Sequence, residues 1–385
     1  MSCPFKHLWA TTPEDGSADV SLATEPDKGS VRPRTCSQTE PEPLNNHINQ
    51  GLAGSVPREG PVCPLGFGAS RGPALSALHC PLCRSLYHDP VLSQPCGHRF
   101  CRYCIQKFGD CPLCGADLDT RALTTDEETQ RAVYNFLDVH AADLGNMQSP
   151  GQHSNDSNID TDEKKRTVNN LLHIGLSSLV GGNPAGGAAF LSRCRSLLED
   201  EARNLTVISD EPSYENMKID IALKLGAVLD CLGDCYRTMG DAVLALEHYD
   251  KAALQLQYAL ENQKSKSKED TLHALSVILN KQGEVLHQQG DIVAALGLYR
   301  RALDARRQRR KAVDDITSCP EAGFDVVVSE LKVADAYRSL GNKDDALQHA
   351  ACARSLLTEV ENHLPLTLSS KKQMVKGYLD SFTTE

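Results

Sequence analysis

Seven of the fifteen cysteines in this 385-residue chain lie within residues 80–114. With His98 they form four closely spaced pairs, three separated by two residues and one by a single residue. In chain order the eight residues are Cys80, Cys83, Cys96, His98, Cys101, Cys104, Cys111 and Cys114. A two-residue spacing lets both sulfurs reach one metal ion, and four such ligands with no open position make a structural zinc site. The spacing therefore predicts two structural zinc ions.

The cellular compartment decides between metal and disulfides, because closely spaced cysteines form disulfides in secreted domains and bind metal in reducing compartments. The first residues, MSCPFKHLWATTPEDG, contain no apolar stretch of signal-peptide length. No window of the chain approaches the roughly 18 consecutive apolar residues that a membrane span requires. We therefore expect a cytoplasmic protein with reduced thiols and no membrane partner.

The order of the four pairs resembles the RING finger, whose ligands are three cysteines, one histidine and four cysteines. This resemblance implies two interleaved sites. One zinc ion would be held by Cys80, Cys83, Cys101 and Cys104, and the other by Cys96, His98, Cys111 and Cys114.

A RING finger usually serves a ubiquitin ligase, and the residues here argue in both directions. Leu82 and Pro112 stand where the family grips its ubiquitin-conjugating enzyme, and Phe108 lies near the usual groove position. Ligase RING fingers commonly carry an Arg or Lys after the last cysteine, because its donors hold ubiquitin and the conjugating enzyme together. Here that position is Gly115, which offers no side chain. A ligase and a zinc module without transfer activity both stay open on these residues.

Charge and motifs exclude several other functions. The formal net charge of -11 argues against nucleic acid as a partner, because an acidic chain lacks the basic surface that neutralises phosphates. Residues 300–311, RRALDARRQRRK, are a basic exception, and we expect them to form the solvated face of a helix. No G-x-S-x-G, H-E-x-x-H or dinucleotide-binding pattern occurs. Any enzymatic activity would therefore come from the cysteine-rich segment.

The N-terminal part of the chain differs in composition from the rest. Residues 1–75 hold ten of the nineteen prolines and show no apolar period, which predicts a disordered tail. Cys-Pro pairs at Cys3 and Cys63 resemble thiolate ligands of haem iron, with an unliganded tail as the alternative. The segments we expect are this tail at 1–75, the zinc module with a following helix at 76–140, a polar linker at 141–165 and a helical repeat domain at 166–385.

Three stretches in the C-terminal part share one pattern of small and large residues. They start at Leu232, Gln282 and Val333, and their glycines recur every fifty or fifty-one residues, at Gly240, Gly290 and Gly341. The pattern resembles the tetratricopeptide repeat, a pair of packed helices, although that family repeats every thirty-four residues. An earlier pair across GGNPAGG and a C-terminal capping helix, LSSKKQMVKGYLDSF, would complete a mostly α-helical fold. Because each repeat contacts mainly its neighbours, loss of zinc should leave the repeat helicity intact.

Stacked helical pairs form a concave groove that binds other proteins. Some repeats of this kind carry Asn where they clamp a partner's terminal carboxylate, and this chain has Asp234, Glu284 and Asp335 there, which would repel a carboxylate. Lys281 and Lys332 match another basic position of those repeats. We expect a folded or folding protein as the client, attracted through a basic patch to an acidic wall. The alternative is that these carboxylates are ordinary solvated surface.

The order of the parts resembles one family over nearly the whole chain. A tail with Cys-Pro pairs, a cysteine-rich segment ending FGDCPLCGADL, and repeats containing LGAVLDCLGDCYRTMGD and LHALSVILNKQGEVL are similar to the plant No Catalase Activity family. That resemblance implies a chaperone that binds catalase through its helical repeats and keeps it active in hydrogen peroxide detoxification and the stress response. The RING finger would then be needed for the structural integrity of the chaperone. The alternative is a RING-type E3 ubiquitin ligase that recruits substrates through the repeats.

Overall fold

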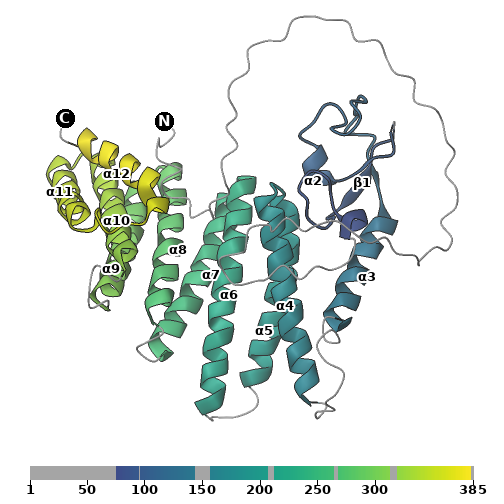
Figure 1. The fold of residues 1–385 in the computed structure, drawn as a ribbon, viewed down its shortest axis with the longest axis horizontal. Helices are drawn as coiled ribbons and strands as arrows, with labels where there is room; N and C mark the ends of the chain where they lie inside the picture. Colours follow the sequence, from purple (N-terminus) through teal and green to yellow (C-terminus); the bar gives the residue numbers. More distant parts are fainter. Residues whose placement is uncertain are drawn as a thin grey trace, which may run out of the picture. The chain divides into compact units, whose positions relative to one another are not determined.

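The computed structural model describes residues 75–94, 96–143, 157–206, 212–263, 268–312 and 319–382. They belong to one compact unit, Ala74–Glu385, and are mostly helical, as the sequence predicted (Figure 1). No helix in this described part combines the length and the apolar character needed to cross a membrane. The predicted tail with Cys3 and Cys63, and residues 144–156 of the predicted linker, lie outside the described residues.

A small three-stranded sheet organises the cysteine-rich segment. β1 (Pro90–Leu92) pairs with β2 (Arg99–Cys101) on one side and with β3 (Thr124–Thr125) on the other, antiparallel in both cases. Val91 lies opposite Phe100, and both side chains are fully buried. Although it is only a few residues long, the sheet therefore contributes buried side chains to the hydrophobic core that continues into the helices.

Helices flank this sheet in the sequence. The short helix α2 (Arg102–Ile105) follows β2 directly. α3 (Glu127–Asp143) begins after Asp126, whose carboxylate accepts a hydrogen bond from the backbone N of Thr129 at 3.0 Å. The same carboxylate pairs with Arg99 Nε at 2.6 Å, which ties the start of α3 to β2. A capping carboxylate at this position satisfies backbone donors that the first turn of a helix leaves free.

The rest of the described chain is an array of helices, seen in chain order from teal to yellow in Figure 1. Neighbours in sequence pack as the pairs α4–α5, α6–α7, α8–α9 and α10–α11, and each pair contacts the next. α4 includes residues 157–165, which the sequence assigned to the linker. The elements not yet bounded are η1 (Leu75–Leu78), α4 (Ser157–Val180), α5 (Pro184–Thr206), α6 (Pro212–Met239), α7 (Ala242–Asn262), α8 (Lys268–Gln289), α9 (Ile292–Ala312), α10 (Pro320–Ser339), α11 (Lys343–Val360), η3 (Leu366–Leu368) and α12 (Ser369–Ser381).

The repeating small residues sit where the two helices of a pair approach most closely. A Cβ added to Gly233 or to Gly283 would lie 2.4 Å from the ring of Tyr249 or of Tyr299, respectively. Both tyrosines are buried, so each ring fills the space that the missing side chain leaves. The regular spacing of glycine and tyrosine in the sequence thus reflects one packing contact, which occurs in both α6–α7 and α8–α9.

The recurring inter-helix glycines have a different role, because they end the first helix of a pair. Gly240, Gly290 and Gly341 have φ values of +86°, +91° and +79°, a left-handed conformation that glycine adopts without steric cost. The next residue begins the second helix. Asp241 accepts a hydrogen bond from Leu244 N at 3.0 Å, for example. Each turn of this kind stops one helix and caps the next within two residues.

The basic run at residues 300–311 is not the solvated face that the sequence predicted. Arg306 is only 6% exposed, and its guanidinium donates to Ser276 Oγ at 3.1 Å and to Ser329 Oγ at 3.0 Å. Arg309 donates to the Asp325 carboxylate at 2.9 Å. The expectation was wrong for these two arginines, because their partners lie on α8 and α10 and cannot be seen in the local sequence. They fasten α9 to both neighbouring helices.

Gly283→Ala should destabilise the array, because its new Cβ would press on the buried ring of Tyr299. Overpacking of this kind costs about 1–3 kcal/mol. Gly297→Ala is the matched control, since no atom lies within 4 Å of the added carbon and alanine favours a helix by up to about 1 kcal/mol. Urea unfolding followed by far-ultraviolet circular dichroism should give a lower midpoint for Gly283→Ala than for the unchanged chain. A midpoint equal to that of Gly297→Ala would contradict this packing.

Candidate metal centre

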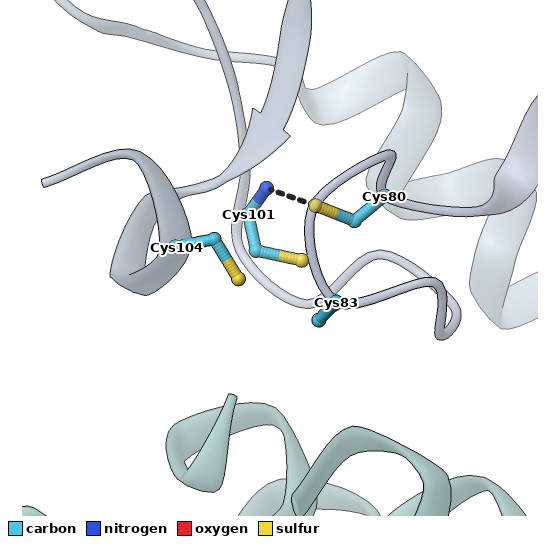
Figure 2. Close-up of side chains that lie close together, drawn as sticks. All are labelled: Cys80, Cys83, Cys101 and Cys104. Carbon is cyan, nitrogen blue, oxygen red and sulfur yellow. Dashed lines mark hydrogen bonds between the residues drawn. The ribbon is translucent and has the colours of Figure 1, made fainter. Parts of the chain in front are cut away.

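Four cysteine side chains converge where the first turn of the cysteine-rich segment meets the end of β2 (Figure 2). Cys80 and Cys83 lie in the turn closed by the bridge between His79 and Leu86. Cys101 ends β2, and the fourth cysteine, Cys104, lies in α2. All four are buried, and their sulfurs lie within 4.8 Å of one another. We name this group the first site.

Backbone and side-chain N–H groups point at the sulfurs of the first site. Cys101 N lies 3.4 Å from Cys80 Sγ, and His88 N lies 3.3 Å from Cys101 Sγ. Asn183, at the start of α5, places its amide Nδ2 3.8 Å from Cys83 Sγ. Hydrogen bonds to sulfur favour the thiolate, which is the form that binds metal.

A second group of ligands lies on the other loops of the segment. Cys96, His98, Cys111 and Cys114 also have ligand atoms within 4.8 Å of one another. His98 presents Nδ1 at 3.5 Å from Cys111 Sγ. Cys111 is buried but Cys114 is exposed, so this second site is open to solvent on one side. Within the described residues these are the groups that could hold a metal ion, and they are the two quartets that the sequence implied.

The two Cys-Pro-Leu-Cys turns have the same backbone design. Cys80 N donates to Ser85 O at 2.9 Å, and Cys111 N donates to Ala116 O at 2.7 Å. In each turn the residue after the second cysteine is left-handed, with φ +56° at Arg84 and +71° at Gly115. Glycine adopts that conformation most readily. Arg84 adopts the same conformation, so the turn favours glycine at position 115 without requiring it.

The donor chemistry fits zinc in both groups. Four ligands at about 2.3 Å around a tetrahedral ion lie roughly 3.8 Å apart, which is compatible with the observed clusters. Hydrogen bonds from the thiols of Cys101 and Cys104 lower the pKa of Cys83 to about 7, whereas the contact with Cys104 raises the pKa of Cys101. Sulfurs this close cannot all be charged without a cation. A bound zinc ion would let all four act as thiolates and would cross-link the turn, β2 and α2.

Comparison with known families agrees with this geometry. Residues 80–114 match the family of zinc fingers of the C3HC4 type (RING finger). This segment is a RING finger. Its two sites could bind zinc as in other members of that family.

Two relatives match over more residues than the RING finger contains. The chain is 32% identical over 286 residues to Protein NCA1 of Arabidopsis thaliana, which covers 73% of this chain and 65% of that protein. The chain therefore spans just under two thirds of this relative's length. It is 32% identical over 90 residues to the E3 ubiquitin-protein ligase RNF166 of Mus musculus, covering 22% of this chain and 37% of that one.

Among solved structures, BtubC (BKLC) from P. vanneervenii matches at a TM-score of 0.41 and 12% identity, over 62% of this chain and 77% of that one. So low a score carries no argument about fold. The assignment of tetratricopeptide-like pairs rests instead on the helix bounds, the glycine–tyrosine contacts and the capped turns of this chain.

The residues predicted to contact a ubiquitin-conjugating enzyme lie on different parts of the RING finger. Leu82 lies in the first turn and is half-buried, packed against the core. Phe108, after α2, is 41% exposed, and Pro112 is exposed in the second Cys-Pro-Leu-Cys turn. The residue that follows the last ligand, Gly115, presents no side chain to solvent. A role for these residues in binding a conjugating enzyme stays a prediction.

The residues predicted to line a client groove are engaged within the chain. Lys281 of α8 donates to the Asp230 carboxylate at 2.8 Å and to Asp234 at 2.7 Å, both on α6. One pair further on, Lys332 of α10 binds Glu284 of α8. In both cases a lysine reaches back to carboxylates of the preceding pair. We call these five residues the inter-repeat ladder.

Aromatic rings complete the ladder. Tyr249 donates its hydroxyl to Asp234 at 2.6 Å, and Lys281 Nζ lies 5.8 Å from the Tyr249 ring. The same packing recurs with Lys332 at 5.6 Å from the ring of Tyr299. This distance permits cation–π attraction.

Asp335 is the last of the predicted carboxylates, and it is also paired. It binds Arg338 at 2.8 Å and the hydroxyl of Tyr378 on α12. Asp234, Glu284 and Asp335, which the sequence placed in one acidic wall, are each paired with a cation of this chain. Their contact with a client stays a prediction.

Metal analysis of the purified chain should find two zinc ions per molecule, because both quartets have a complete donor set. Cys114→Ser should reduce the count to one, since the first site shares no ligand with the second. Cys352→Ser is the control, because Cys352 is an exposed thiol of α11 outside both groups. A count of one or none in the unchanged chain would contradict two structural sites.

Lys281→Met should destabilise the array, because it leaves the largely buried Asp230 without its cation and leaves Asp234 with Arg237 alone, at 3.5 Å. Removing one partner of a buried ion pair costs about 3–5 kcal/mol, and we expect about 3 kcal/mol here since the lysine side chain is still 12% exposed. Lys251→Met is the control, because Lys251 pairs with Glu247 on the surface of α7, where such a pair is worth about 0–1 kcal/mol. Free energies of unfolding from urea titrations measure the difference. Equal losses in both variants would show that the ladder does not stabilise the array.

Proposed function

We propose that this chain is a cytoplasmic chaperone that binds catalase through its helical repeats and promotes or maintains catalase activity in hydrogen peroxide detoxification and the stress response. The observation that carries the proposal is the similarity to Protein NCA1 over 286 residues. The RING finger occupies only residues 80–114, so an alignment of that length must extend well into the helices. This agrees with the resemblance of the repeat sequences to the No Catalase Activity family.

The helical array has physical properties that suit a holding chaperone. Three of its pairs, α6–α7, α8–α9 and α10–α11, are joined in sequence by the inter-repeat ladder, so this part of the array can present a stable surface without a partner. Around the ladder, the carboxylates of Asp230, Asp234, Glu284 and Asp335 are balanced by Lys281, Lys332, Arg237 and Arg338. Recognition there would depend on shape and hydrogen bonds more than on net charge. In our proposal the array transiently covers catalase subunits before they form tetramers and enter peroxisomes.

The alternative function is a RING-type E3 ubiquitin ligase. It is favoured by the RING finger itself, by the 32% identity to an E3 ubiquitin-protein ligase over 90 residues, and by the exposure of Phe108. Two observations oppose it. Gly115 offers no donor to ubiquitin, and the connector between α4 and α5 contacts Cys83 and Lys107, which are the sequence neighbours of Leu82 and Phe108. The chain's own helices therefore border the surface that a conjugating enzyme would need.

Leu82→Ala separates the two functions, because a ligase needs this side chain for its conjugating enzyme and a chaperone does not. Catalase should be co-expressed with the unchanged chain, with Leu82→Ala or with Leu254→Ala, an exposed leucine of α7 that serves as the control. We expect catalase activity to rise equally with all three chains and catalase to co-purify with each. Metal analysis should confirm that Leu82→Ala keeps both zinc ions.

The contrary result is equally clear. The ligase would be favoured if the unchanged protein assembled polyubiquitin with purified components. Leu82→Ala should then lose this activity, and Leu254→Ala should keep it. If the unchanged chain did not raise catalase activity, the proposed chaperone function would be contradicted.

A further inference from the structure

The connector between α4 and α5 lies directly against the first turn of the RING finger. A Cβ added to Gly181 would lie 2.1 Å from the backbone oxygen of Cys83, so only glycine fits at this contact. Lys107, after α2, donates to Gly182 O at 3.1 Å. The helical array and the first site are therefore in backbone contact, through residues that the sequence assigned only to a helix connector.

Buried polar contacts surround this junction. Ser85 and Ser178 are both buried, and their hydroxyl oxygens lie 2.7 Å apart. Ser85 also donates to Ile174 O at 3.3 Å. Next to them, the ring of His88 packs edge-on against Phe190 at 6.2 Å. Hydrogen bonds sealed from solvent are costly to leave unmade, so the junction favours one relative placement of its two sides.

Asn183 joins the two sides through a single side chain. It is completely buried. Its Oδ1 accepts from Gly186 N at 3.0 Å, which caps the first turn of α5. Its Nδ2 donates to Cys83 Sγ at 3.8 Å, a sulfur of the first site. In this one orientation the amide group accepts the hydrogen bond from the first turn of α5 and donates to the sulfur of Cys83.

We propose that the RING finger is the N-terminal cap of the helical array and that Asn183 couples the first zinc site to the start of α5. A zinc ion at the first site would fix the turn that carries Cys83 to β2 and α2, and so would keep the sulfur that accepts from Asn183 Nδ2 in place. Without the ion, that turn is no longer fixed against Gly181, and the junction opens. The second site has no partner in α4 or α5 among the described hydrogen bonds, so its loss should matter less. This coupling is independent of whether the client is catalase.

The direct test is Asn183→Asp in the full chain. Aspartate keeps an oxygen to cap Gly186 N but replaces the amide donor with a second carboxylate oxygen facing the sulfur. Substituting a residue that hydrogen-bonds to a metal ligand typically lowers metal affinity by about 10–100-fold. We expect zinc to leave the first site at least roughly tenfold faster in the presence of a chromogenic chelator, with two ions still bound before chelation. Hydrogen exchange of residues 174–190, followed by mass spectrometry, should accelerate by a similar factor.

Two controls make the result specific. Asn342→Asp makes the same change at the helix cap of α11, where the amide donates to the Asp345 carboxylate and not to a metal ligand, and it should alter neither zinc release nor exchange at residues 174–190. Cys114→Ser removes a ligand of the second site and should leave that exchange nearly unchanged, whereas Cys83→Ser should raise it. Unchanged zinc release in Asn183→Asp would overturn the proposal even with faster exchange, because Asn183 would then be only a helix cap. Equal exchange in Cys83→Ser and the unchanged chain would overturn the coupling as well.

Discussion

A lysine that reaches back to the carboxylates of the preceding helical pair is the contact on which the shape of the array depends. The pairs α6–α7 and α8–α9 are each closed internally by a glycine against a tyrosine ring, but that contact does not position one pair on the next. Lys281 and Lys332 do so, because each bridges from its own pair to one or two carboxylates and a tyrosine ring of the pair before. Arg306 and Arg309 add bonds from α9 to α10. Separating one of these lysines from its carboxylates would leave a partly buried charge without its partner, which is costly. The surface offered to a client is therefore set by an internal electrostatic arrangement.

The start of the array is held in a different way. Terminal repeats need a cap, because one face has no neighbouring pair to cover it. Here the RING finger contacts α4 and α5 through the Ser85–Ser178 and Asn183–Cys83 hydrogen bonds. A zinc finger used as a cap needs no transfer chemistry, which agrees with the absence of a side chain at Gly115. The same placement lets metal binding contribute folding energy to helices that contain no ligand.

The sequence predicts the features that depend on local spacing. Two zinc sites follow from the four closely spaced pairs of ligands, and the resemblance to the RING finger implies which pairs share an ion. The helical pairs follow from recurring glycine, alanine and tyrosine. Features that join distant segments were not predictable in this way. Arg306 was expected in solvent because its run is basic, yet its buried partner Ser329 is 23 residues away. The contact of Asn183 with Cys83 spans 100 residues, and a connector of glycines, asparagine and proline gives no sign of it. The pairing of Asp234 likewise depends on how one pair stacks on the next.

In the function we propose, the chain itself holds catalase in an active form, without ubiquitin or a conjugating enzyme. The most direct measurement is the activity recovered when denatured catalase is diluted into buffer containing haem and an equimolar amount of the purified, zinc-loaded chain. The account predicts a clear increase over the same dilution with serum albumin, together with a complex of chain and catalase detectable by size-exclusion chromatography. Recovery equal to that with albumin, with no complex, would contradict it.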